Sequence, residues 1–255
     1  MNIDFVKKML IDFPENRHIR SKFLRKEKIT EEEKSEVLKS NGRWLSKSDL
    51  SNFLVFVDWP GLNKLQELIK DTIENNIDGD FIETGVWKGG MCILAKCIYD
   101  ELQINKKVFV ADSFEGLPPP DIEKYPCDKG DIHYSLPGLS ISLEQVQDNF
   151  RLFDCLDDNV VFIKGWFKDS LPTAPVEKLS ILRLDGDMYE ATINSLDNLY
   201  HKLSVGGYCI IDDYEGHAGC KQAVNDFRIK HNITEELIKI DNVNPSQEHY
   251  WKKER

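Results

Sequence analysis

The sequence predicts an α/β fold built on a mostly parallel β-sheet with helices on both of its faces. From Asp80 onward, short runs rich in β-branched and aromatic residues alternate with stretches in which apolar residues recur at helical spacing. This alternation is typical of βαβ units, whose strands lie parallel. Two runs, ILRL and YCII, are nearly continuous in apolar residues, as strands covered on both faces are, with Arg183 as the exception.

A helical segment precedes the candidate strands. Residues 1–75 contain no extended β-type alternation, and their apolar residues recur at helical spacing in DFVKKMLIDF, TEEEKSEVLKS and GLNKLQELIKDTIENN. The expected strands are DFIETG, KVFVADSF, VVFIKGWF, LSILRLDGD and YCIIDDY, followed by the weaker runs ELIKID and HYWKK. We therefore predict a helical extension over 1–75, which caps the substrate or makes subunit contacts, and an α/β domain over 76–255.

Residues 115–138 lack a regular pattern and are rich in Pro and Gly. A helix is expected after them, with Ser142 as its N-cap residue and Glu144 in its first turn. An insert of this length inside a compact domain is usually a lid or a binding loop. We expect a lid over the substrate, and its side chains would select that substrate.

Charge and composition exclude two classes of partner. The chain has 255 residues, a formal net charge of −11 and 30 % charged residues, whereas binding to nucleic acid or to an anionic membrane surface needs a basic surface. No stretch reaches the ~18 apolar residues of a spanning helix, and the N-terminus lacks the apolar core of a signal peptide, so we expect a cytoplasmic protein. The six cysteines form no C-x-x-C pair, which indicates neither a metal site nor disulfides.

Acidic residues follow two of the predicted strands, at the point where each strand ends. Asp185 and Asp187 end the run LRLDGD, and Asp212 and Asp213 end YCIIDD. If these tips are adjacent, the repulsion between the carboxylates must be offset by shifted protonation or by a bound cation. Three carboxylates without His or Cys between them suit Mg²⁺ or Mn²⁺. The alternative is a set of solvated acids in ordinary turns.

A glycine-containing turn follows the first strand. The motif FIETGVWKGG contains neither G-x-G-x-x-G nor G-K-[ST], so a small cofactor without phosphates fits it better than a dinucleotide or a nucleoside triphosphate. At the end of the next strand, Asp112 is suited to bind the two hydroxyls of a ribose. The alternative is that Asp112 only caps the turn that follows it.

Five motifs in order resemble the macrocin and mycinamicin O-methyltransferases: DFIETGVWKGG, VFVADSFEGLP, GWFKDSLP, LRLDGDMYEAT and LSVGGYCIIDDY. The resemblance spans Gly79 to Tyr214, with a plausible extension to Trp251. It implies the Rossmann-like class I methyltransferase fold with a seven-stranded sheet, S-adenosylmethionine as cofactor, Mg²⁺, and methylation of a hydroxyl on a natural-product, nucleotide-linked or surface-polysaccharide sugar. It also implies a homo-oligomer, dimeric or tetrameric.

The resemblance further implies roles for individual residues. The cofactor would be bound by Glu83, Thr84, Gly85, Asp112, Ser113, Trp166, Phe167 and Asp185, and the metal by Asp185, Asp212 and Asp213. Catalysis would involve Asp185, Asp187 and His217, with the general base open among a metal-site carboxylate, Asp187 and His217. Catechol O-methyltransferase, a more distant relative, has a lysine three residues after the first metal ligand. Met188 stands there in this chain, which argues against a lysine base.

Three alternatives stay open at this level. The DGD motif could belong to a D-x-D glycosyltransferase that uses a sugar nucleotide, whereas Tyr189 fits poorly with the nucleophile loop of a phosphatase. A methyltransferase of this type could act on another small acceptor. A non-catalytic binding protein of the same fold would bind the cofactor without depending on a metal.

Overall fold

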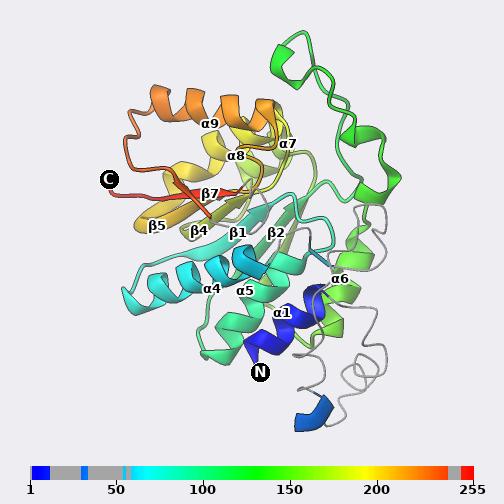
Figure 1. Ribbon diagram of the computed structural model, residues 1–255, viewed down its shortest axis with the longest axis vertical. Helices are drawn as coiled ribbons and strands as arrows, with labels where there is room; N and C mark the ends of the chain where they lie inside the picture. The colour runs from blue at the N-terminus through cyan, green and yellow to red at the C-terminus, as the bar shows by residue number, and fades with distance from the viewer. Residues whose placement is uncertain (1, 12–29, 34–53, 56–58, 241–247) are drawn as a thin grey trace.

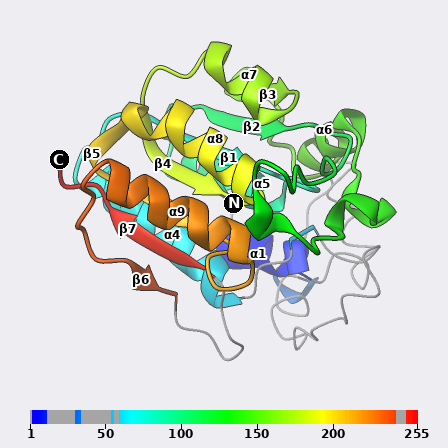
Figure 2. The same ribbon diagram turned by 90° about the horizontal axis from the view of Figure 1, so that it is seen from above.

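The computed structural model describes residues 2–11, 30–33, 54–55, 59–240 and 248–255. Their strands form one seven-stranded sheet in the order β3-β2-β1-β4-β5-β7-β6 (Figures 1 and 2). The strands are β1 (Asp80–Thr84), β2 (Val108–Asp112), β3 (Val160–Lys164), β4 (Leu179–Leu184), β5 (Leu203–Ile211), β6 (Ile238–Lys239) and β7 (His249–Lys252). Strand β7 runs antiparallel to both of its neighbours, and the other neighbouring pairs are parallel. The predicted mostly parallel sheet is therefore confirmed.

Helices cover both faces of the sheet (Figure 2). One face carries α1 (Ile3–Ile11), α4 (Trp59–Glu74), α5 (Gly90–Glu101) and α6 (Leu143–Leu152), and the other carries α7 (Phe167–Ser170), α8 (Tyr189–Leu199) and α9 (Ala218–Lys230). A hydrophobic core lies on each face of the sheet, the first under α1, α4, α5 and α6 and the second under α7, α8 and α9. Because successive side chains of a strand point to opposite faces, Phe81 packs into the first core and Ile82 into the second. Among the described residues, no helix is long and apolar enough to cross a membrane.

The described part of the N-terminal segment packs into the main core. Val6 and Leu10 of α1 and Leu62 of α4 are buried in the same cluster as Phe81 of β1. At the start of the predicted helix TEEEKSEVLKS, Thr30 and Glu33 exchange the two hydrogen bonds of a capping box, at 2.9 and 3.2 Å. Most of that helix lies outside the described residues. The division into residues 1–75 and 76–255 stays a prediction, and α1 and α4 form a layer of the fold.

The strand register brings the predicted site residues to one edge of the sheet. Thr84 of β1 lies beside Ala111 of β2 and Leu184 of β4, and Leu184 lies beside Ile211 of β5. The chain leaves β1 toward β2 and reaches β4 on the other side, so this edge contains the topological switch point where such sheets bind ligands. Gly85 is required here because its φ is +86° and a Cβ atom would lie 1.7 Å from the carbonyl oxygen of Asp185.

The lid segment (residues 115–138, green in Figure 1) contains three short 3₁₀ turns and no α-helix or strand. The turns are Pro126–Asp128, His133–Ser135 and Pro137–Leu139, the last of which runs one residue past the lid. Tyr125 stacks on Tyr189 with ring centroids 4.9 Å apart. The indole of Trp87 donates a hydrogen bond to the carbonyl of Gly138 at 2.9 Å. The lid segment is thus attached to α8 and to the turn after β1, and the helix after it begins at the predicted cap, Ser142.

Candidate functional site

A buried arginine lies beneath the acidic strand tips. The Arg183 side chain, on β4, is fully buried and forms ion pairs with Glu83, Asp185, Asp212 and Glu248. Its Nη1 lies 2.7 Å from Asp185 Oδ2, and its Nη2 lies 3.2 Å from Glu248 Oε1. One guanidinium thus holds carboxylates from β1, from the tips of β4 and β5, and from the residue before β7. Arg183 cannot neutralise all four.

Burial, together with the excess of negative charge, raises the pKa values of these carboxyl groups. Burial raises the pKa of Glu83 to about 7, opposed by the charge of Arg183. Burial and the neighbouring Asp212 raise the pKa of Asp185 to about 8, again opposed by Arg183. The pKa values of Asp212 and Asp213 are also raised by burial, and for Asp213 the charges of Asp187 and Asp212 add to this shift. At neutral pH, bound protons or a further cation must therefore offset part of the negative charge of this cluster.

Asp185, Asp212 and Asp213, the three residues predicted to bind a metal ion, lie close together. One carboxylate oxygen from each residue lies within 4.8 Å of those of the other two. Arg183 contacts Oδ2 of Asp185 and Oδ1 of Asp212, so each of these carboxylates has a second oxygen outside that ion pair. Hard oxygen donors and uncompensated negative charge are what Mg²⁺ prefers. The residues present fit a divalent cation.

Asp187 and His217 meet beside this triad. Asp187 has a φ of +59°, a conformation that residues other than glycine rarely adopt, and its N–H donates to Asp213 Oδ2 at 3.2 Å. His217 is the N-cap residue of α9, and its Nε2 lies 3.3 Å from Asp187 Oδ1 and 3.9 Å from Asp213 Oδ1. The structure thus brings together all three predicted catalytic residues, since Asp185 belongs to the same cluster.

Asp112 lies at the tip of β2 and organises two turns. Its Oδ2 accepts a hydrogen bond from the N–H of Val86 and its Oδ1 one from the N–H of Phe114, each at 2.8 Å. Burial raises the pKa of Asp112, whereas these backbone hydrogen bonds lower it. Ser113 donates from its hydroxyl to the carbonyl of Gly116 at 2.7 Å. The Ser113 hydroxyl also lies 3.4 Å from Asp112 Oδ1. Asp112 therefore caps the turns.

The remaining predicted cofactor residues lie at the tips of β1 and β3. Thr84 is buried, and the buried Glu83 carboxylate contacts Arg183 and the thiol of Cys92, so the backbone of the turn after β1 is what can face a ligand. Trp166 is the N-cap residue of α7, directly after β3. Phe167 packs against the second core, near Gly186 between the acidic residues of the DGD motif.

Four residues of this region are absent from the sequence-based site. Arg183 and Glu248 complete the buried ion-pair cluster, and Asp131 and His133 of the lid segment lie next to His217. The sequence does contain a signal for Arg183, which is a charged residue inside the apolar run ILRL. A buried arginine needs anionic partners, so its position predicts carboxylates nearby. No comparable signal exists for Glu248, which directly precedes β7, or for Asp131, which lies in the lid segment.

Comparison with known proteins assigns the family. The family model described as macrocin O-methyltransferase (TylF) matches residues 6–253. The chain belongs to this family. Membership implies S-adenosylmethionine as the methyl donor, and it decides for methyl transfer over glycosyl transfer or ligand binding alone.

Individual relatives support the assignment. The chain is similar to demethyldecarbamoylnovobiocin O-methyltransferase of Streptomyces niveus, with 44 % identity over 210 residues that cover 78 % of this chain and 79 % of the relative. It is 42 % identical over 196 residues to mycinamicin III 3''-O-methyltransferase of Micromonospora griseorubida, covering 75 % of each. The solved structure of the O-methyltransferase NovP matches with a TM-score of 0.77 and 41 % identity, covering 85 % of this chain and 90 % of that one. The class I methyltransferase fold is therefore confirmed.

Gly219, in the first turn of α9, is in direct contact with the lid segment. A Cβ atom there would lie 1.8 Å from Asp128 Oδ1, which accepts the N–H of Tyr189 at 2.9 Å. We expect Gly219→Ala to displace Asp128 and loosen the lid, although Gly to Ala inside a helix normally stabilises by about 0.5–1 kcal/mol. Steady-state kinetics should give a fall in turnover of about 10-fold to 100-fold, with unchanged S-adenosylhomocysteine affinity.

The matched control is Asp128→Ala/Gly219→Ala, in which the conflict with the Asp128 carboxylate is absent and the 2.9 Å approach of the new Cβ to the backbone N of Tyr189 remains. Relative to Asp128→Ala, this double variant should lose less heat stability than Gly219→Ala loses relative to the wild type, because the conflict with the carboxylate has been removed. Wild-type kinetics in Gly219→Ala would show that contact with the lid is not needed for turnover.

Proposed function

We propose that this O-methyltransferase is Mg²⁺-dependent and methylates a hydroxyl group of a sugar, with Asp185, Asp212 and Asp213 as metal ligands. The observation that carries the proposal is the convergence of these three carboxylates, with one oxygen from each within 4.8 Å of the other two, beside the glycine turn at the switch point of the sheet. Their raised pKa values support it, because a divalent cation would neutralise charge that Arg183 leaves uncompensated.

A sugar acceptor is supported by the relatives. Mycinamicin III 3''-O-methyltransferase is 42 % identical, and a third relative at 40 % identity, from Streptomyces olivaceus, is named for the 4'-O-methylation of a dimethoxyrhamnosyl group on tetracenomycin C. A sugar attached to a larger natural product is the acceptor class that these names share. We propose the same class here, and nucleotide-linked or surface-polysaccharide sugars are the second candidates.

Asp187 is the proposed proton acceptor. Its left-handed backbone conformation and its N–H bond to Asp213 hold it next to the metal triad. His217 Nε2, at 3.3 Å from Asp187 Oδ1, would stabilise the carboxylate and share the proton that it takes from the acceptor hydroxyl. Mg²⁺, when bound, supplies Lewis acidity that lowers the pKa of that hydroxyl.

The cofactor would lie along the tips of β1, β2 and β3. The turn after Thr84 has no side chain at Gly85, which lets a ligand approach the backbone. Asp112 and Ser113 are the proposed partners of the ribose, and Trp166 and Phe167 those of the adenine. S-adenosylmethionine supplies an electrophilic methyl group, and the protein contributes the alignment of that group with the acceptor oxygen.

Removal of the Asp112 carboxylate tests the cofactor site. We expect Asp112→Ala to weaken S-adenosylhomocysteine binding at least tenfold, about 1.4 kcal/mol, in calorimetric titration with and without Mg²⁺. Part of the loss arises because Val86 and Phe114 lose their hydrogen-bond acceptor. Thermal melting of the unliganded variant measures that structural part separately.

Asp158→Ala is the matched control. Asp158 is exposed and precedes β3, at the opposite edge of the sheet. This variant should bind S-adenosylhomocysteine as the wild type does. Absence of binding to the wild type, with or without Mg²⁺, would overturn the proposed cofactor site.

A further inference from the structure

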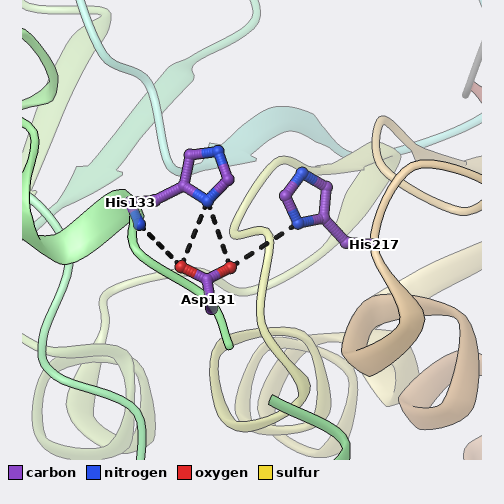
Figure 3. Close-up of side chains that lie close together, drawn as sticks. All are labelled: Asp131, His133 and His217. Atoms are coloured by element: carbon purple, nitrogen blue, oxygen red, sulfur yellow. Dashed lines mark hydrogen bonds and ion pairs between the residues drawn. The ribbon is translucent and has the colours of Figure 1, made fainter. Parts of the chain in front are cut away.

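We propose that Asp131, His133 and His217 form a second cation site, which binds a transition-metal ion such as Zn²⁺ or Co²⁺ and ties the lid segment to the body of the enzyme. Figure 3 shows the Asp131 carboxylate between the two imidazole rings. One ligand atom from each residue lies within 4.8 Å of the other two. This site is separate from the proposed magnesium triad in both its ligands and its chemistry.

The distances suit ligands of a single ion. His133 Nδ1 lies 3.1 Å from Asp131 Oδ1 and from Oδ2, and His217 Nδ1 lies 3.7 Å from Asp131 Oδ2. The last distance is too long for a hydrogen bond. Tetrahedral Zn²⁺ with bonds of about 2.0–2.2 Å places its ligand atoms roughly 3.3–3.6 Å apart. A cation between the three side chains therefore needs only small side-chain adjustments.

The donor set selects a different class of ion from the triad. Two imidazoles and one carboxylate suit Zn²⁺, Co²⁺ and other transition metals, whereas Mg²⁺ prefers oxygen ligands alone. Three protein ligands leave a fourth position for water, so the geometry is that of an open site.

The ligands are already oriented by second contacts, as the ligands of metal sites usually are. His217 has Nδ1 toward Asp131 and Nε2 toward the carboxylate of Asp187 at 3.3 Å, so its Nε2–H would donate while Nδ1 binds the ion. The N–H of His133 donates to Asp131 Oδ1 at 2.8 Å, which fixes that carboxylate. The side chains of Asp131 and His217 are 10 % and 20 % exposed, so the site is sheltered yet open to ions from solvent.

A metal ion bound at this second site would restrain the lid segment. Asp131 and His133 belong to the lid segment, whereas His217 caps α9 next to Asp187. An ion bound to all three would fix the lid against α9 and engage His217, which the proposed function uses beside the proton acceptor. We therefore expect Zn²⁺ to inhibit methyl transfer at saturating Mg²⁺.

Cobalt absorption spectroscopy tests the site directly, without reference to activity. Addition of Co²⁺ to the wild-type enzyme with excess Mg²⁺ should produce the intense visible bands of four-coordinate cobalt at one equivalent, and Zn²⁺ should abolish them. His133→Ala and Asp131→Asn should each lose the bands, whereas His201→Ala, which removes an exposed histidine elsewhere, should keep them. Far-ultraviolet circular dichroism establishes that each variant is folded.

Asp213→Asn distinguishes this site from its neighbours. Asp213 belongs both to the proposed magnesium triad and to a third grouping with Asp187 and His217. Retention of the cobalt bands in Asp213→Asn supports the lid site, and their loss there or their persistence in His133→Ala overturns it. In His133→Ala, methyl transfer without zinc should persist and zinc inhibition should be lost, so a failure of the cation site is distinct from a failure of the proposed function.

Discussion

Arg183→Met should lower the free energy of unfolding by about 3–5 kcal/mol, the cost of breaking a buried ion-pair cluster by removing one side. The variant leaves the carboxylates of Glu83, Asp185, Asp212 and Glu248 without the guanidinium that they share. Methionine keeps most of the side-chain length, so the loss reports charge and hydrogen bonding more than cavity formation. Urea unfolding followed by circular dichroism measures the change.

Arg151→Met is the control for this prediction. Arg151 has an ion pair with Asp148 at 2.5 Å, with both side chains more than half exposed, and such pairs contribute about 0–1 kcal/mol. If Asp185 and Asp212 bind a cation, Mg²⁺ should also stabilise Arg183→Met more than the wild type, because the ion replaces part of the lost charge. Equal losses for the two arginine variants would contradict the role given to the buried cluster.

Asp213→Asn should abolish Mg²⁺-dependent methyl transfer, with turnover reduced about 10³-fold or more, since a metal ion contributes several kcal/mol of stabilisation to the reacting oxygen. Asp213 is the member of the triad to replace, because Arg183 forms ion pairs with the other two and their replacement would also break those pairs. The asparagine is nearly equal in size, and its carbonyl can still accept the N–H of Asp187. Radiolabelled methyl transfer at several Mg²⁺ concentrations measures the loss.

Two measurements separate a metal effect from damage to the fold. S-adenosylhomocysteine affinity should change by less than about threefold, or 0.6 kcal/mol, because Asp213 lies on β5's tip and not in the cofactor turn. Asp197→Asn, which changes an exposed partner of Lys230, should retain full turnover. Turnover near the wild-type level in Asp213→Asn would contradict the proposed triad.

The sequence by itself determined the sheet and the edge where the site lies. Alternation of apolar runs with helical stretches requires βαβ units, and βαβ units place the carboxyl ends of parallel strands at one edge. The positions of Asp185 and Asp212 directly after such runs therefore predict their convergence without coordinates, and the register confirms that β4 and β5 are neighbours. Asp112 ends β2, which β1 separates from β4.

Only the tertiary structure decided how the charges are arranged. Arg183 and Glu83 are 100 residues apart, and Glu248 is 65 residues from Arg183, so their contact depends on strand register and on the pairing of β7 with β5. The same holds for Asp131 and His133, because an irregular lid has no periodicity from which its folded path can be derived. Local pattern determines which face or edge a residue occupies, whereas contacts between distant irregular segments depend on packing of the whole chain.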